Sequence, residues 1–340
     1  MNPSLPLRFA ALAVAAPLLA LAASSPHKAS PTPAPPAAAP APPPAFVAAA
    51  QRLEERWKAA APKSSDPVIR LLAGAPFAAG EIERIAASAA TDPLALYWLH
   101  AACTAELRPT GCPAKAAAVT LTQVDPDNAV GWIERFNAAS ARGNAFDADA
   151  SLARAAQARR YDLRQGELLK RLADFSRQID AEATLPVVVA VAGNALRPQQ
   201  LARLLDACRP PAAGEKRSPL AESRRKQCWS IFETMATRGT DVAAAWTAAS
   251  VMRRLAATEA EKKRAAELRL RASRLSAAGA VGPWTSFEAR TDLSPRGLWS
   301  LYLADLIAVG EIAATERALT RSGMKLEDID PNQPMTKMRR

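Results

Sequence analysis

The sequence has little of what catalytic sites usually need. The 340-residue chain contains two histidines, His27 and His100, and aromatic residues make up 5% of it. It has no glycine-rich phosphate-binding loop, no Gly-x-Ser-x-Gly elbow and no His-Glu-x-x-His helix. A histidine-dependent triad would rest on His100 alone, because His27 stands in a proline-rich stretch, and we interpret His100 as structural. The sequence therefore predicts no catalytic, cofactor-binding or metal-binding residues, and we expect a protein that is not an enzyme.

Charge is also scarce at the N-terminus, where residues 1–22 have the pattern of a secretory signal peptide. Arg8 is the one charged residue among them, and the run from Phe9 to Ala22 is apolar. Small residues stand at the positions that a signal peptidase reads, Ala20 and Ala22. An uncleaved anchor is the alternative, but the run is short for a membrane span and Pro17 interrupts it. We therefore expect an exported protein, either periplasmic or secreted.

Residues 23–45 form a segment that is almost entirely proline and alanine. Such a segment cannot build a core and favours extended polyproline geometry. We interpret it as a spacer that holds the folded part away from a membrane or cell wall. The alternative is a proline-rich ligand for another protein.

Residues 46–322 are expected to form one helical domain. Alanine dominates this stretch, and alternation typical of strands is nearly absent. Alanine is the best helix former and lets helices approach closely. The run Leu185–Val191 has a strand-like composition, but its helical neighbours favour a buried helix. The predicted class is all-α, as a solenoid of helical hairpins or an irregular helical array, followed by a flexible basic tail at residues 323–340.

Four cysteines are present, Cys103, Cys112, Cys208 and Cys228. An even number in an exported chain indicates two disulfides. Of the three pairings, we favour the two that are local in sequence, Cys103 with Cys112 and Cys208 with Cys228, because each would join neighbouring helices across a loop. A closed loop of about ten residues stabilises by roughly 2–3 kcal/mol in the chain-entropy model. A zinc site is the alternative, but these spacings differ from the short pairs that zinc sites use.

The clearest helical pattern runs from residue 92 to residue 160. Asp92-Pro93 is typical of a helix start, and Pro113 opens a second helix. A third helix is expected over 129–141, and a fourth begins at Phe146. Turn-forming residues separate each pair, so the segment predicts two consecutive helical hairpins.

Trp98 and Trp132 lie 34 residues apart in this segment, which is the period of a tetratricopeptide repeat. Positions that fit the pattern of small and large residues are Ala102, Ala114 and Pro126 in the first copy and Ala139, Ala148, Leu152 and Ala155 in the second. About half of the signature is present in each copy, and Arg160 replaces the closing proline of the second. The segment resembles a pair of tetratricopeptide repeats, and an ordinary helical bundle with an accidental tryptophan spacing is the alternative.

The resemblance implies a stack of hairpins whose concave face binds a protein or peptide partner. We therefore expect an exported bacterial envelope protein that acts as a protein-interaction scaffold without catalysis. One alternative is an envelope hydrolase that cleaves cell-wall material at a carboxylate site within a helical array. Glu233 and Asp241 are candidates for such a site, although no motif distinguishes them from other carboxylates of the chain.

A second alternative is a charge-driven binder of acidic envelope polymers or an anionic lipid surface. The formal net charge is +11, and removal of the signal with Arg8 leaves 43 basic and 33 acidic residues. The densest basic stretch is Lys216–Lys226. It has no interleaved aromatic residues, so no nucleic-acid partner is expected. Solvated surface charge remains the plainer interpretation.

Overall fold

The computed structural model describes residues 41–74, 77–78, 80–104, 111–192, 201–210 and 218–332. Within these ranges the chain forms sixteen α-helices and a few 3-10 turns, without a β-strand. The predicted all-α class is confirmed. The signal peptide and residues 23–40 of the spacer lie outside the described residues. Of the described helices, none has the combination of length and apolarity that a membrane span requires.

The first seven helices follow one another along the chain: α1 (Pro44–Ala60), α2 (Pro67–Leu72), α3 (Glu81–Ala89), α4 (Pro93–Thr104), α5 (Ala114–Val124), α6 (Ala129–Ala141) and α7 (Ala145–Gln157). Four of these helices have a side-chain cap at the N-terminus, where a side-chain oxygen accepts hydrogen bonds from the free backbone N–H groups of the first turn. The capping residues are Asp66, Asp92, Asn128 and Asn144. The four helices predicted over 92–160 are present close to their expected bounds.

The spacer ends two residues before the predicted boundary at residue 45. Pro44 is the first residue of α1, a position where the missing N–H of proline leaves no helical bond unmade. Phe46 and Leu53 of this helix are 3% and 0% exposed. Because Phe46 already belongs to the core, the helix that carries it begins within the proline-rich segment.

Three helices come next: α8 (Gln165–Ile179), α9 (Leu185–Ala192) and α10 (Ala202–Ala207). The strand-like run at Leu185 is helical, as its neighbours indicated. An extended connector, residues 158–164, joins α7 to α8. Its Tyr161 is 1% exposed, and its Arg160 and Tyr161 form isolated bridges with Asn128 and Gly239. Ala158, Tyr161 and Leu163 of the connector are buried, whereas Arg159 is exposed, so the connector packs against the neighbouring helices along one side.

The remaining helices are α11 (Pro219–Arg238), α12 (Val242–Leu255), α13 (Glu259–Val281), α14 (Phe287–Thr291), α15 (Leu298–Val309) and α16 (Glu311–Arg321). A capping box formed by Thr258 and Glu261 starts α13. Gly310, whose φ is 81°, separates α15 from α16. Left-handed backbone of this kind favours glycine, which is why the break between the two helices falls at this residue.

The expected flexible tail is wrong for residues 323–332. After α16 the chain forms a 3-10 turn over Leu326–Asp328 and folds back on the core. Ile329 is 5% exposed, and Met324 and Leu326 pack against the same cluster. Removal of these three apolar side chains from water stabilises the folded-back position of the segment, and a mobile tail would leave them exposed. Residues 333–340 lie outside the described residues.

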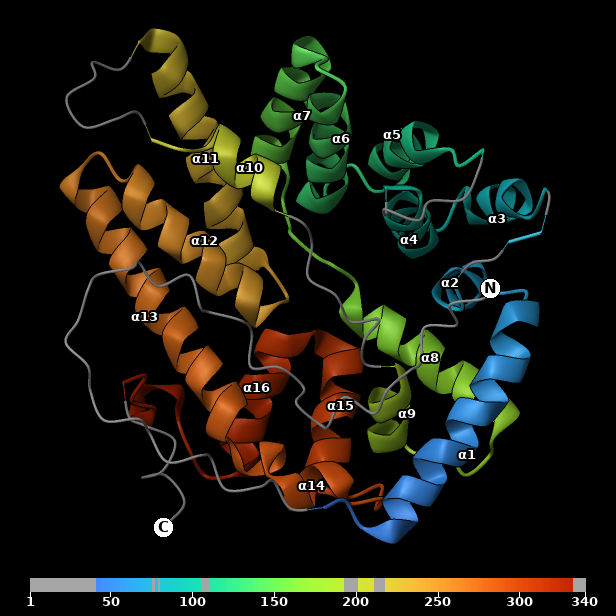
Figure 1. Ribbon diagram of the computed structural model, residues 1–340. Coiled ribbons are helices and arrows are strands. Elements are labelled where there is room, and N and C mark those ends of the chain that lie inside the picture. Colours follow the sequence, from blue (N-terminus) through green and yellow to red (C-terminus); the bar gives the residue numbers. More distant parts are fainter. Residues whose placement is uncertain are drawn as a thin grey trace, which may run out of the picture.

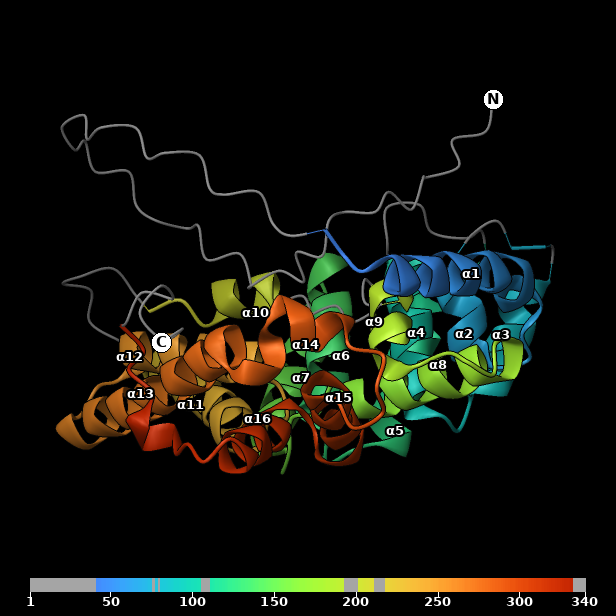
Figure 2. The same cartoon turned by 90° about the horizontal axis from the view of Figure 1, so that it is seen from below.

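The helices follow a curved path that returns toward its start (Figure 1). From α1 the path runs through α4–α7 to α11, α12 and α13, and then back through α16 and α15. Helix α15 packs on α8 and α9, and both of these pack on α1. Seen at right angles, the array is shallow, with α8 and α9 beside α1 at one end and α11–α13 at the other (Figure 2).

The path closes where α15 and α16 meet α8 and the start of α12, and we call this contact the closure seam (Gly166, Asp241, Leu306, Gly310 and Glu311). A Cβ added to Gly166 would lie 2.6 Å from the carbonyl oxygen of Leu306, so only glycine lets α8 approach α15 this closely. The backbone N–H of Val242 donates to Glu311 Oε2 at 2.7 Å. The seam therefore joins residues that are far apart in the sequence.

Candidate functional site

The tetratricopeptide-like segment places its two tryptophans at equivalent positions, each in the first helix of a hairpin. Trp98 lies in α4 and Trp132 in α6, and both are partly buried against the core. Four of the positions that fit the repeat pattern, Ala139, Ala148, Leu152 and Ala155, are at most 6% exposed. These residues form the packing between α6 and α7, which leaves them no role at a binding surface.

The stack of consecutive hairpins is interrupted after α7. In an uninterrupted array the next helix in the chain would pack on α7. Here α11 packs on α7, and α10 packs on α6, while α8 departs along the connector toward α1. The binding surface expected from the repeats therefore has no continuous sequence of hairpins beyond residue 157.

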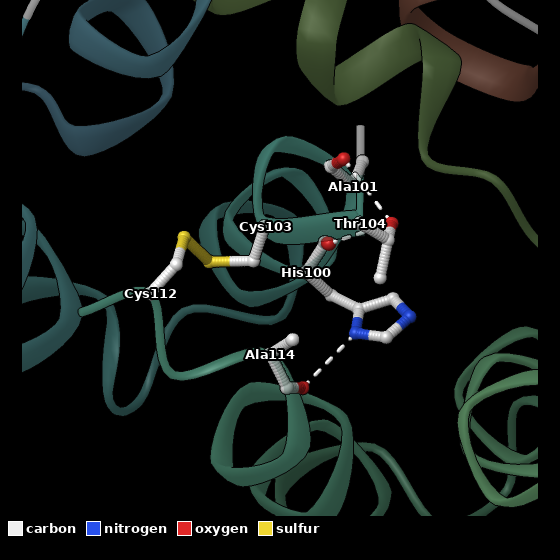
Figure 3. Close-up of a disulfide and its surroundings, with 6 residues drawn as sticks. All are labelled: His100, Ala101, Cys103, Thr104, Cys112 and Ala114. Carbon is white, nitrogen blue, oxygen red and sulfur yellow. Dashed lines mark hydrogen bonds between the residues drawn. A yellow bond between two sulfur atoms is a disulfide. The ribbon is translucent and has the colours of Figure 1, made fainter. Parts of the chain in front are cut away.

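Both disulfides have the predicted pairing. Cys103 and Cys112 join α4 to the start of α5 with Cα atoms 5.3 Å apart, and Cys208 and Cys228 join α10 to α11 with Cα atoms 5.7 Å apart. Figure 3 shows the first disulfide beside His100, on the same helix. Disulfides of this kind form and persist in oxidising compartments. No cysteine of the chain is free to hold a metal, and the described residues contain no cluster suited to one.

His100 is a buried structural residue between three helices. Its Nδ1 lies 3.0 Å from the carbonyl oxygen of Ala114, and its Nε2 lies 3.3 Å from Glu134 Oε2. A carbonyl oxygen can only accept, so Nδ1 carries a proton, and the carboxylate favours a second proton on Nε2. Burial alone would lower the pKa of His100, but the hydrogen bond and the charge of Glu134 outweigh it and raise the pKa. The resulting pair ties α4 to α5 and α6 and is closed to substrate.

Two acids, Asp241 and Glu311, lie together in the closure seam, where Asp241 is buried and Glu311 is partly buried. Asp241 accepts from the backbone N–H of Ala244 and from Gln165 Nε2, and Glu311 accepts from Val242. Burial and the charge of Asp241 raise the pKa of Glu311 to about 8. Burial also raises the pKa of Asp241. Both carboxyl groups thus serve the N-terminus of one helix, where the N–H groups of its first turn face them.

The two carboxylates singled out from the sequence have different partners. Glu233 pairs with Arg264 at 3.2 Å on the surface, whereas Asp241 is 6% exposed and caps α12. Among the described residues they share no hydrogen-bond partner, and neither of them lines the two grooves described below. Their geometry is that of a surface ion pair and a helix cap, which offers no support for hydrolysis at this pair.

The basic stretch Lys216–Lys226 is largely neutralised where the structure describes it. Arg224 pairs with Asp149, and Arg225 pairs with Glu222 and Glu261. Arg225 is itself buried, with 9% exposed. Lys216 and Arg217 lie outside the described residues. The expected docking patch for acidic polymers therefore loses two of its cations to internal carboxylates.

An open groove of about 640 Å³ runs along one side of α13. We call it the arginine groove; its lining residues come from α12, α13 and the C-terminal segment and include Trp246, Arg253, Arg269, Leu270, Ser273, Ser276 and Asn332. Its charged lining residues are both arginines, and neither has a carboxylate partner among the residues that the structure describes. This makes the groove the best candidate for a binding site.

Arg269 is held in place inside this groove. Its guanidinium lies 3.5 Å from the centre of the Trp246 ring, a cation–π contact. Its Nη1 donates to Ser250 Oγ at 2.8 Å and to the carbonyl oxygen of Trp246 at 3.4 Å. Burial and the neighbouring charge of Arg253 lower the pKa of Arg269. The site therefore presents a fixed, uncompensated cation.

A second groove, of about 500 Å³, runs along the opposite side of α13, and we call it the mixed-charge groove. Its charged lining residues are three acids and three bases: Glu267, Glu316, Glu327, Arg271, Arg274 and Lys325. Arg271 pairs with Glu316 across it at 2.8 Å. Leu270 lies on the ridge between the two grooves and is 45% exposed. One helix thus separates a cationic groove from a charge-balanced one.

Comparison of the chain with protein-family models, curated proteins and solved structures finds no match. Its function has to be inferred from its own geometry. Sequence reasoning missed the arginine groove because Trp246 and Arg269 are 23 residues apart on different helices. The available signal in the sequence was the pair Arg253 and Arg269, which stand on neighbouring helices. The sequence does not show that both arginines line one groove or that Arg269 contacts Trp246.

Proposed function

We propose that this protein is an exported, non-catalytic scaffold of a bacterial envelope that binds a protein or peptide partner along its helical surface. The signal-like N-terminus and the proline-rich spacer support export to the periplasm or beyond. Two disulfides in the predicted pairing support the same compartment. The curved array of hairpins, part of which resembles tetratricopeptide repeats, supports a role in binding.

The observation that carries this proposal is the arginine groove beside α13. It combines a half-exposed leucine, a tryptophan and two arginines that have no carboxylate partner among the described residues, all at the hairpin of α12 and α13. Interfaces are enriched in tryptophan and arginine relative to the rest of a protein surface. The groove lies outside residues 92–160, where the sequence alone placed the binding surface.

Site-specific photo-crosslinking in intact cells tests the proposal. A photoreactive residue at Leu270 should give a discrete crosslinked protein, identified by mass spectrometry. The matched control is Leu298, which is 44% exposed on α15 and lies in neither groove. Equal crosslinking at both positions, or none at Leu270, would contradict a partner in the groove. Purified protein that cleaved cell-wall material would contradict the absence of catalysis.

A further inference from the structure

We infer that the arginine groove binds an extended, acidic peptide segment whose carboxylates meet Arg253 and Arg269 and whose apolar residues lie along the far end of α13. This inference rests on the proposed scaffold function and names the chemistry of its partner. Four properties of the groove support it, namely its charge, the fixation of Arg269, its polarity along the helix and its length.

Charge selects the sign of the ligand. Arg253 and Arg269 are the charged residues of the lining, and both lack a carboxylate partner among the described residues. By contrast, most arginines elsewhere on the described surface pair with Asp or Glu, as Arg271 does with Glu316 across the ridge. An anion entering the groove relieves the repulsion between two like charges, whereas a cation adds to it.

The fixed orientation of the Arg269 guanidinium favours a planar anion such as a carboxylate. Its stacking on Trp246 and its bonds from Nη1 hold the guanidinium plane. The Nη2 and Nε donors have no partner among the residues that the structure describes. A planar guanidinium that is already ordered binds a carboxylate at a smaller entropy cost than a free side chain does.

The lining changes character along α13. Arg269 lies near the middle of α13, Ser273 and Ser276 follow, and the C-terminal end of the helix lines the groove with small apolar residues, Ala277, Ala280 and Val281. Asn332, from the C-terminal segment, also lines the groove. The hydroxyl and amide groups in the middle match the N–H and C=O groups of a peptide backbone. An acyl chain on the same surface would leave them without hydrogen bonds, so a peptide fits this lining better than a lipid.

The length of the groove sets the size of the segment. Its lining on α13 runs from Ala266 to Val281. At 1.5 Å per helical residue this is about 22 Å, which an extended chain of roughly seven residues covers at 3.3 Å each. The expected ligand is therefore a short linear segment, with one or two acidic residues at one end and apolar residues at the other.

A fluorescence-anisotropy titration tests the inference on the purified exported chain with its disulfides intact. The probe is a labelled octapeptide with two glutamates followed by leucine and alanine residues, and its control has glutamine in place of glutamate. We expect the glutamate peptide to bind and the double variant Arg253→Gln/Arg269→Gln to weaken it at least tenfold. The glutamine peptide should bind the native protein no better than the glutamate peptide binds the double variant.

The matched protein control is Arg271→Gln, which removes one positive charge two residues from Arg269 but in the mixed-charge groove. It should change the affinity less than twofold. An effect of Arg271→Gln as large as that of the double variant would show that net charge, and not the groove, attracts the peptide. Circular dichroism of each variant verifies that the helices are intact.

Two further outcomes separate this inference from the alternatives. Vesicles of phosphatidylcholine with phosphatidylglycerol should not compete with the peptide; competition that depends on Arg253 and Arg269 would overturn the peptide in favour of a lipid surface. Specific crosslinking at Leu270 together with failure of the acidic peptide would retain the scaffold function and overturn acidic recognition. Loss of both signals would overturn both.

Discussion

Helices α4–α7 and the closure seam hold the molecule together in different ways. In α4–α7 each helix packs on the next one in the chain, and caps, a disulfide and the His100–Glu134 pair connect residues within 40 positions of each other. In the seam, Gly166, Asp241 and Glu311 come from three distant parts of the chain. The first region can form locally, whereas the second forms only once the whole array has folded.

The largest expected effect is on the packing of α15, the helix that contributes Leu306 to the seam. Trp284 is 2% exposed and stacks on Tyr302 with ring centres 6.0 Å apart. We expect Trp284→Ala to lower the free energy of unfolding by about 3–5 kcal/mol, because it leaves a large cavity. Urea unfolding measures the loss. Hydrogen exchange should rise in α15 and α16 and stay low in α4–α7; a uniform rise would show that the two regions unfold as one unit.

Removal of a disulfide should act more locally. Replacing Cys103 and Cys112 by serine should destabilise by about 3 kcal/mol, since the bridge closes a short loop in the unfolded chain. The sequence separations of the two disulfides are 9 and 20. The corresponding loss for Cys208 and Cys228 should be larger by about half a kcal/mol. Thermal unfolding of both double-serine variants gives the order, and an inverted order would contradict the loop-length argument.

The seam should also make stability depend on pH. Folded Glu311 keeps its proton up to about pH 8, whereas in the unfolded chain the group ionises near 4.5. Between these values the unfolded state releases a proton that the folded state retains, so stability falls as pH rises. Glu311→Gln should remove this fall and stabilise the protein at pH 8 by on the order of 1–2 kcal/mol.

Chemical denaturation at pH 5 and pH 8 measures this effect. The corresponding variant in α4–α7 is His100→Gln. The pKa of His100 is raised in the folded protein, so His100 also favours the protonated folded form. Its stabilising contribution is present below pH 6.5 and is lost as pH rises through the folded value. An unchanged pH profile in Glu311→Gln would show that the acid pair is not what titrates.

The smallest effect is expected from a purely local cap. Asn144 caps α7 by accepting from the backbone N–H of Asp147 at 3.1 Å, and it is exposed. Asn144→Ala should cost about 1 kcal/mol and leave the exchange of the seam unchanged. Asn144→Asp, which keeps the acceptor, should restore the stability. A larger loss that spread to α15 would remove the distinction between the two regions.

Much of the local structure could be predicted because its signals are short-range. Asp92-Pro93, the capping box at Thr258 and the break at Gly310 each fix a helix end within a few residues. Both disulfides were predictable for the same reason, since each joins neighbouring helices. The short helices around Trp284 and the buried return of Ile329 were missed, because burial of single side chains in short segments leaves no periodic pattern.

The sequence by itself determined that this chain is helical and where many of its helices begin and end, and it favoured the cysteine pairing that the structure has. These properties depend on contacts between residues a few positions apart, and their physical causes can be read along the chain. The tertiary structure alone decided that α11 follows α7 in the stack, that Asp241 and Glu311 share one helix start, and that Arg269 lies on Trp246 in a groove without acids. Such features depend on which surfaces pack together, and many packings satisfy the same helical pattern.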